Sequence, residues 1–150
     1  MLIGVISDTH GALDSRVHTA FRGVERILHA GDVGPAAVLH ELETIAPVDA
    51  VAGNTDIHGE CSRLPGVLTV TIAGTRITLV HDLASLLRSG VPQGVSFVVS
   101  GHTHVAEIVH SPDITYLNPG SASQPRGIRG PSVALIQITG DRREARVRYL

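Results

Sequence analysis

Two histidines at the end of an apolar segment are the first residues in this sequence that could do chemistry. Gly101-His102-Thr103-His104 follows residues 95–100, an apolar run that predicts a buried strand ending at the glycine. If the chain stays extended beyond this strand, the two imidazoles lie on the same side, roughly 6–7 Å apart. They could bind one metal ion together or lie on either side of two ions.

Four other predicted strands also end in side chains that can bind a metal. Each of these positions follows an apolar segment directly: Asp8 with His10, Asp32, Asn54 with Asp56, and His81. Ligands of parallel α/β proteins bind at the carboxyl ends of the strands. Each residue alone has an ordinary explanation, as a helix cap, a turn residue or a strand-end histidine. Those explanations give no reason for all five strand ends to be polar.

The types of these side chains favour a transition metal and more than one ion. The set contains four imidazoles, three carboxylate or amide groups and no thiolate: Asp8, His10, Asp32, Asn54, His81, His102 and His104. Such a mixture suits Mn²⁺, Fe or Zn²⁺, with Ni²⁺ and Co²⁺ as alternatives, and is too rich in nitrogen for Ca²⁺. Seven ligands exceed the three or four of one catalytic zinc. Two ions about 3.5–4 Å apart would use all seven, with one bridging carboxylate.

The elements that position these residues are predicted to alternate between strand and helix in the first third of the chain. Residues 2–7, 24–30 and 48–52 are apolar enough for buried strands. The segments between them carry apolar residues at helical spacing. This β-α-β-α-β order implies parallel strands with right-handed crossovers.

The rest of the chain is predicted to be mainly antiparallel. Residues 68–72 and 76–80 alternate between polar and apolar around a short turn, which predicts a hairpin. A short helix is expected at residues 84–88. Further strands are expected at residues 95–100, 105–109, 114–117, 133–138 and 144–149.

The composition is that of a globular metal protein. The chain has 150 residues, 43% of them hydrophobic and 17% charged, so we expect one domain over residues 1–150. Nine histidines stand beside only four aromatic residues, which favours metal binding. The net charge of −2 does not predict a nucleic-acid partner, although arginines cluster near the C-terminus.

The sequence also bears on the cellular compartment. No run of 18 apolar residues is present, so no membrane partner is expected, and the first strand begins at Leu2, which leaves no room for a signal peptide. The single cysteine, Cys61, excludes an internal disulfide and a zinc site built from cysteines. We therefore expect a cytoplasmic protein, and we leave open whether it forms a homo-oligomer.

The ordered set of motifs resembles that of the calcineurin-like metallophosphoesterases. The motifs are Asp8-x-His10, Gly31-Asp32, Gly53-Asn54-x-Asp56, His81 and Gly101-His102-Thr103-His104, in this order. The lack of insertions, together with Asn118-Pro119-Gly120-Ser121 and Pro125-Arg126, is similar to the compact single-domain phosphodiesterase branch of that family. The resemblance covers essentially the whole chain, and its specificity lies in the order of motifs that are individually weak.

The resemblance implies an α/β fold: a four-layer α-β-β-α sandwich of two mixed sheets with the metal site at one edge. By position, the first metal ion would be held by Asp8, His10 and His104, and the second by Asn54, His81 and His102, with Asp32 bridging. The implied reaction is hydrolysis of a small phosphate ester by in-line attack of metal-bound hydroxide on phosphorus. We expect two divalent ions, Mn²⁺ first among the candidates, and catalytic roles for Asp32, Asn54 and His102.

Two positions depart from the commonest pattern of the family. Thr55 stands where many members carry a histidine that protonates the leaving oxygen, and where the compact branch often has cysteine. Because a threonine hydroxyl is a poor general acid, alkyl leaving groups should react more slowly than acidic aryl ones. Asp82 stands where glycine usually follows the metal histidine. We expect it to be a solvated turn residue, with orientation of His81 as the alternative.

Three residues near the motifs are expected to have roles other than metal binding. We expect Asp56 to hydrogen-bond its loop without binding metal, and His29 to be structural. Arg126 could contact the phosphate of a substrate, with a solvated loop arginine as the equal alternative.

Three other functions compete with phosphate ester hydrolysis. The same fold serves as a protein-interaction scaffold in retromer, with a degraded metal site, whereas all seven expected ligand positions are filled here. A mononuclear Fe(II) oxygenase would also use histidines and a carboxylate, but it would need an all-β jelly roll, which the β-α-β-α-β opening contradicts. A nuclease would be expected to have an added domain or a basic groove, and the sequence indicates neither. The expected partner is therefore a small phosphate ester.

Overall fold

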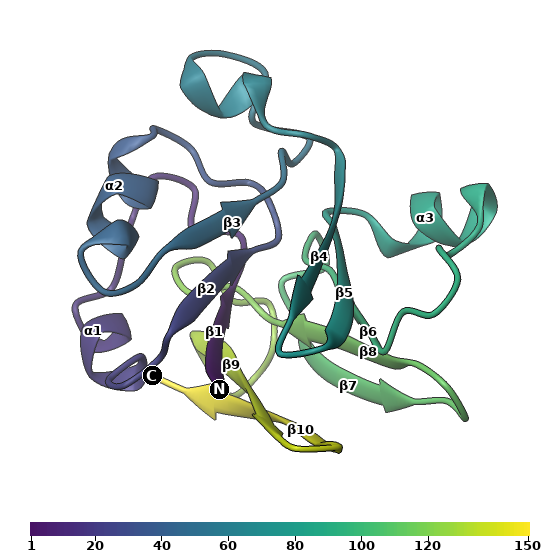
Figure 1. Cartoon of the computed structure of the whole chain (residues 1–150). Coiled ribbons are helices and arrows are strands. Elements are labelled where there is room, and N and C mark those ends of the chain that lie inside the picture. Colours follow the sequence, from purple (N-terminus) through teal and green to yellow (C-terminus); the bar gives the residue numbers. More distant parts are fainter.

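The computed structural model describes residues 1–150 and contains two five-stranded sheets (Figure 1). The first sheet has the order β10-β9-β1-β2-β3. Its strands are β1 (Leu2–Ile6), β2 (Arg26–His29), β3 (Val48–Ala50), β9 (Ser132–Thr139) and β10 (Arg142–Tyr149). Strands β1, β2 and β3 are parallel, and α1 (Arg16–Ala20) and α2 (Ala37–Glu43) connect them as predicted. The last two strands of the chain complete this sheet, because β9 pairs antiparallel with β1 and with β10.

The second sheet has the order β4-β5-β6-β8-β7. Its strands are β4 (Val67–Ile72), β5 (Thr75–Val80), β6 (Phe97–Val99), β7 (Ala106–His110) and β8 (Thr115–Pro119). The hairpin of β4 and β5 is confirmed. The prediction that the rest of the chain is mainly antiparallel is confirmed by the pairs β4–β5, β7–β8, β1–β9 and β9–β10. Within the second sheet, however, β5, β6 and β8 are parallel to one another, which was not predicted. Parallel neighbours need a crossover, which α3 (Leu83–Ser89) and β7 supply.

The layers follow the predicted sandwich, and the fold class is confirmed. Apolar residues of both sheets meet in one core, which includes Ile3 and Val5 from the first sheet and Leu79 and Val99 from the second. The helices α1 and α2 pack through a second apolar cluster on the outer face of the first sheet, and α3 packs on the outer face of the second (Figure 1). One 3₁₀ helix, Glu60–Arg63, was not predicted; it buries Cys61 in the second cluster.

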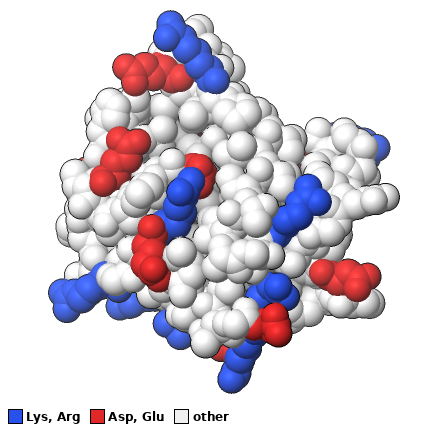
Figure 2. Space-filling model, viewed as in Figure 1, with Lys and Arg blue, Asp and Glu red and all other residues white.

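The surface carries both acidic and basic side chains. On the face shown in Figure 2, acidic and basic side chains are interspersed over both sheets. No helix is long and apolar enough to span a membrane.

The interior of the first sheet holds one fully buried histidine, His29, at the end of β2. Its Nδ1 accepts the Gly31 N–H at 3.2 Å, so the proton of the neutral ring is on Nε2, which donates to the Thr9 hydroxyl at 3.0 Å. That hydroxyl in turn donates to the Val33 carbonyl at 2.9 Å. The structural role expected of His29 is thus confirmed: it joins the loops that follow β1 and β2.

We predict that His29 makes the protein less stable as the pH falls from about 6.5 to about 4. Burial lowers the pKa of His29 from 6.5 to about 4, so in that interval the unfolded chain binds a proton that the folded chain does not. Wild-type protein should lose about 2–3 kcal/mol of unfolding free energy more than His29→Asn between pH 7 and pH 4.5. Urea unfolding at the two pH values, with a chelator present, measures this difference.

The matched control for this experiment is His40→Asn, whose histidine side chain is 64% exposed. This variant should show the pH dependence of the wild type. An equal pH dependence in wild type and His29→Asn would contradict the neutral, buried state of His29.

Candidate metal centre

All seven residues predicted as metal ligands lie together at one edge of the sandwich. They come from the loops that follow five parallel strands, three of the first sheet and two of the second. The two sheets meet here directly, because His81 Nε2 of the second lies 3.3 Å from Asp32 Oδ2 of the first. The side chains form two groups that share this edge.

The first group contains Asp8, His10, Asp32 and His104. One potential ligand atom from each of the four lies within 4.8 Å of the others. His104 Nε2 is 3.2 Å from Asp8 Oδ1 and 3.3 Å from His10 Nε2. Asp8, Asp32 and His104 are buried, and His10 is partly exposed. These residues are the predicted ligands of the first ion together with the predicted bridge.

The second group is arranged around the side-chain oxygen of Asn54. His81 Nε2 lies 3.0 Å from Asn54 Oδ1, and His102 Nδ1 lies 3.1 Å from the same atom. His81 is buried, whereas Asn54 and His102 are exposed. These three residues are the predicted ligands of the second ion, and their exposed members make this side of the centre the accessible one.

Asp32 lies between the two groups. Its Oδ2 is 3.7 Å from His10 Nε2 of the first group and 3.3 Å from His81 Nε2 of the second. Its Oδ1 accepts the Thr55 N–H at 2.9 Å. Burial acts to raise the pKa of Asp32, but the Thr55 N–H and the neighbouring His81 and His10 outweigh it, so the pKa lies below its usual value. The carboxylate is therefore ionised near neutral pH and has one oxygen free to face both groups.

The histidine tautomers test whether these side chains fit a cation. The Nδ1–H of His81 donates to the Ala30 carbonyl at 2.8 Å, and that of His104 donates to the Gln124 carbonyl at 2.6 Å. In the neutral rings the Nε2 lone pairs therefore face carboxylate and amide oxygens at 3.0–3.3 Å. Atoms that bind the same ion at about 2.0–2.2 Å lie roughly 3–3.6 Å apart. The donor set and its spacing fit divalent metal ions.

The backbone that presents these side chains is in an unusual conformation. Six residues other than glycine have a positive φ, and five of them are predicted ligands: Asp8, His10, Asp32, His102 and His104. The left-handed region is uncommon for such residues, though Asp and His are enriched in it. The condition under which both imidazoles would lie on one side, an extended segment, is not met, because φ is 71° at His102 and 61° at His104. Their imidazoles consequently enter different groups.

Several hydrogen bonds that support the centre were not predicted from the sequence. The Ser7 hydroxyl donates to Asp8 Oδ2 at 2.7 Å, and the Ser121 hydroxyl donates to the Asp8 carbonyl at the same distance. Asn118 Nδ2 donates to the Gly101 carbonyl at 2.8 Å and to Thr103 Oγ1 at 3.0 Å. These bonds fix the loops after β1 and β6. Asn118 and Ser121 belong to a motif noted in the sequence, but their partners were not predicted, since these lie far away in the chain.

The secondary roles expected near the motifs have mixed outcomes. Asp56 hydrogen-bonds its loop as expected, because its carboxylate accepts the N–H groups of Val33, Gly34 and Gly53. Asp82 is solvated as expected, with a side chain that is 41% exposed, and His81 is oriented by the Ala30 carbonyl rather than by Asp82. Asp82 caps α3 by accepting the Ala84 N–H at 3.0 Å. The Arg126 side chain is exposed, and its backbone N–H donates to the His104 carbonyl at 3.1 Å.

Two glycines allow the loops to approach one another closely. A Cβ atom added to Gly53 would collide with the backbone nitrogen and Oδ1 of Asp32. One added to Gly101 would collide with Ser7 Oγ and lie 2.6 Å from Asp8 Oδ2. The loops that carry Asn54 and His102 therefore lie directly against the two carboxylates of the centre.

The chain is similar in sequence to metallophosphoesterases over nearly its full length. A model of the calcineurin-like phosphoesterase superfamily domain matches residues 1–141. A probable metallophosphoesterase of Methanothermobacter thermautotrophicus is 40% identical over 98% of this chain and 91% of its own length. The probable metallophosphoesterase YsnB of Bacillus subtilis is 27% identical over 94% of this chain and 86% of its own length.

Solved structures with this fold include both enzymes and Vps29 proteins. A structure described as a novel archaeal phosphodiesterase is 25% identical, with a TM-score of 0.75 over 99% of this chain and 100% of that one. Vps29 of Chaetomium thermophilum is 20% identical, with a TM-score of 0.79 over 100% of this chain and 95% of that one. The latter likeness shows the fold alone.

We predict that Gly53→Ala weakens Mn²⁺ binding about tenfold or more, because the added methyl group displaces the Asp32 carboxylate that both groups face. Losses of about 10–100-fold are usual when a residue that holds a ligand in place is altered. Isothermal titration calorimetry of the metal-free protein with Mn²⁺ measures the affinity. The control is Gly127→Ala, since a Cβ there has no atom within 4 Å. Equal affinities in the two variants would contradict this account of the centre.

Proposed function

The chain belongs to the calcineurin-like phosphoesterase superfamily, and on that premise we propose that it hydrolyses small phosphate esters at a dinuclear divalent-metal site. Phosphodiesters are the substrates we favour, and Mn²⁺ is the ion we expect. In this proposal Asp8, His10 and His104 hold one ion, and Asn54, His81 and His102 hold the other. Asp32 bridges them.

One observation carries the dinuclear assignment: Asp32 Oδ2 lies between the imidazoles of His10 and His81, at 3.7 and 3.3 Å. A carboxylate oxygen in that place is shared by the two groups rather than belonging to one. A pair of divalent ions in such a site activates water and neutralises charge on the phosphoryl group. The ions would also satisfy the nitrogen and oxygen lone pairs that face each other here.

The exposure of the residues indicates how a substrate would approach. Asp8, Asp32, His81 and His104 are buried, whereas Asn54, Thr55 and His102 are exposed. A phosphate ester therefore reaches the centre from the side of Asn54 and His102. The His102 imidazole lies there to contact the phosphoryl oxygens, and Thr55 lies on the same side, following Asn54 directly in the chain.

The enzyme has more support than a protein-interaction scaffold. The archaeal phosphodiesterase and this chain cover one another almost completely, and the predicted ligand set is complete and assembled in two groups. The likeness to Vps29 rests on the fold. The scaffold stays an alternative, and an activity assay separates the two.

We predict that the purified protein loaded with Mn²⁺ hydrolyses bis(p-nitrophenyl) phosphate and that Asp32→Asn and His102→Ala lower kcat/KM at least 100-fold. The first change removes the shared negative charge, and the second removes an imidazole from the accessible side. Release of p-nitrophenolate measures the rate. The matched controls are Asp113→Asn and His110→Ala, which alter exposed residues of the same types outside the centre. Protein that binds Mn²⁺ and turns over no ester would favour the scaffold.

We predict that Thr55→His accelerates hydrolysis of esters with poor leaving groups. An imidazole can protonate a departing oxygen at neutral pH, whereas a threonine hydroxyl cannot, and such proton transfer contributes about 10²–10⁴-fold. The variant should raise kcat/KM for diphenyl phosphate at least tenfold relative to bis(p-nitrophenyl) phosphate, whose leaving group is more acidic. Thr55→Val, which removes only the hydroxyl, should leave that ratio unchanged. No rise with histidine would refute the account of a missing acid at this position.

A further inference from the structure

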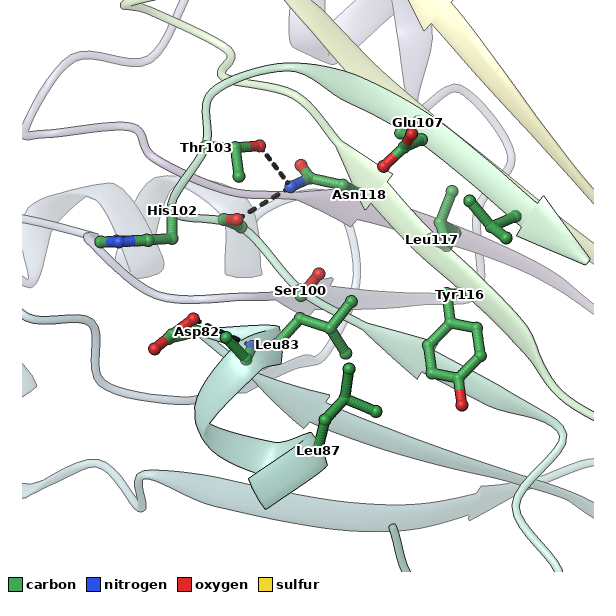
Figure 3. Close-up of a pocket in the computed structure, with 13 residues that line it drawn as sticks. Asp82, Leu83, Leu87, Ser100, His102, Thr103, Glu107, Tyr116, Leu117 and Asn118 are labelled. Carbon is green, nitrogen blue, oxygen red and sulfur yellow. Dashed lines mark hydrogen bonds between the residues drawn. The ribbon is translucent and has the colours of Figure 1, made fainter. Parts of the chain in front are cut away.

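A groove of about 510 Å³ lies on the outer face of the second sheet, where α3 leaves the sheet uncovered (Figure 3). Its floor consists of cross-strand pairs of β7 and β8: Val109 lies opposite Tyr116, and Glu107 lies opposite Asn118. Figure 3 shows Leu83 and Leu87 of α3 as the wall that faces Tyr116. Val109 is 46% exposed and Leu87 is 53% exposed, so this apolar surface is open to solvent.

The groove ends at the metal centre. Its end is formed by the loop of residues 100–103, and His102 belongs both to this lining and to the group around Asn54. The loop is held in place, since Asn118 Nδ2 donates to the Gly101 carbonyl and to Thr103 Oγ1 (Figure 3). The backbone N–H of His102 donates to Asp8 Oδ2 at 3.1 Å. A group bound beside His102 can thus pass from the exposed side of the centre into the groove.

A second hollow fixes the direction in which such a group would run. This hollow lies along the opposite flank of α3, and Asn54, His81 and His102 are among the residues that line it, so it opens onto the second group of the centre. The groove shares only His102 and Asp82 with it, and Asn54 is not part of the groove. The function proposed above puts the leaving oxygen beside Asn54 and Thr55, neither of which lines the groove, so on that proposal the groove lies toward the other ester group of a phosphodiester.

The charge of the lining restricts the chemistry of that group. Two carboxylates, Asp82 and Glu107, line the groove, and no arginine does. Glu107 is exposed, and the Asp82 carboxylate caps α3, where Arg88 Nη2 lies 3.9 Å from its Oδ2, so Glu107 is the carboxylate of the lining without a basic partner. An anionic group would meet like charge on entering, whereas an uncharged or cationic group would not.

We propose that this groove binds the ester group that stays on phosphorus, and that this group is apolar and carries no negative charge. The substrate class is therefore a phosphodiester with one ester group that is apolar and uncharged. The proposal rests on the phosphodiesterase activity proposed above. The volume of about 510 Å³ lies within the range of roughly 300–1,000 Å³ usual for small-molecule pockets.

The test compares three p-nitrophenyl phosphodiesters that share one leaving group. Their second ester groups are methyl, phenyl and 4-carboxyphenyl. With protein loaded with Mn²⁺, we expect kcat/KM for the phenyl ester to exceed that for the methyl ester at least about tenfold, mainly through KM, because the ring is buried against Leu87 and Tyr116. The carboxyphenyl ester should lose most of that advantage.

Two variants in the groove and one control outside it tie this selectivity to the groove. Leu87→Ser should lower the phenyl-to-methyl ratio of kcat/KM about threefold or more. Because Leu87 is exposed, this variant is expected to fold. Ile128→Ser, which alters a fully exposed apolar residue outside the groove, should keep the wild-type ratio. Glu107→Gln should raise the carboxyphenyl-to-phenyl ratio about threefold or more, since it removes like charge.

The possible failures are distinguishable. If no diester is hydrolysed, the proposed function and the groove proposal both fall. If the methyl ester is hydrolysed but the phenyl ester is not preferred, or if Leu87→Ser and Ile128→Ser give the same ratio, the groove proposal alone is refuted. If Leu87→Ser changes only the oligomeric state seen by light scattering, the groove is an interface between copies of the chain, which also refutes the proposal.

Discussion

The structure depends on a set of electron-rich atoms that are brought to within 3–4 Å of one another at the edge of the sandwich. The imidazoles of His81 and His104 each use one nitrogen to donate to a backbone carbonyl, so the other nitrogen faces oxygens of Asp8, Asp32 and Asn54. Without a cation between them, such atoms repel one another and are poorly solvated. The surrounding loops therefore have to hold the arrangement against its own electrostatics.

Many contacts of the loops at this edge hold the ligand residues in place. Five ligand residues take up left-handed backbone conformations, each of which costs on the order of 1–3 kcal/mol and persists only where its surroundings impose it. The surroundings do so through bonds between distant segments. Asp56 gathers three backbone N–H groups from two loops, and Ser121 and Ser123 both donate to the Asp8 carbonyl. The loops of the centre are accordingly tied to one another by hydrogen bonds between distant segments.

The sequence predicted the parts of this protein that depend on residue type and order. Apolar segments ending in Asp, Asn or His located the strands and brought the seven candidate ligands to one edge. The sequence did not predict the parallel pairing of β5, β6 and β8, because alternation along a strand does not reveal its neighbours. It also did not predict the left-handed conformation of His102 and His104, or the bonds from Ser7 and Asn118. Those depend on contacts between segments that only the folded chain brings together.

The pairing of β1 with β9 affects the order in which the strands of the first sheet can pair during synthesis. The strand that leads to Asp8 lies between β2 and β9, and β9 begins only at Ser132. During synthesis, the edge of β1 that faces β9 therefore stays unpaired after all seven candidate ligands, the last of them His104, have been made. The His102 N–H contacts Asp8 directly, so this contact does not require β9. The strand that leads to Asp8 is thus covered on its second edge by a segment that contributes no candidate ligand.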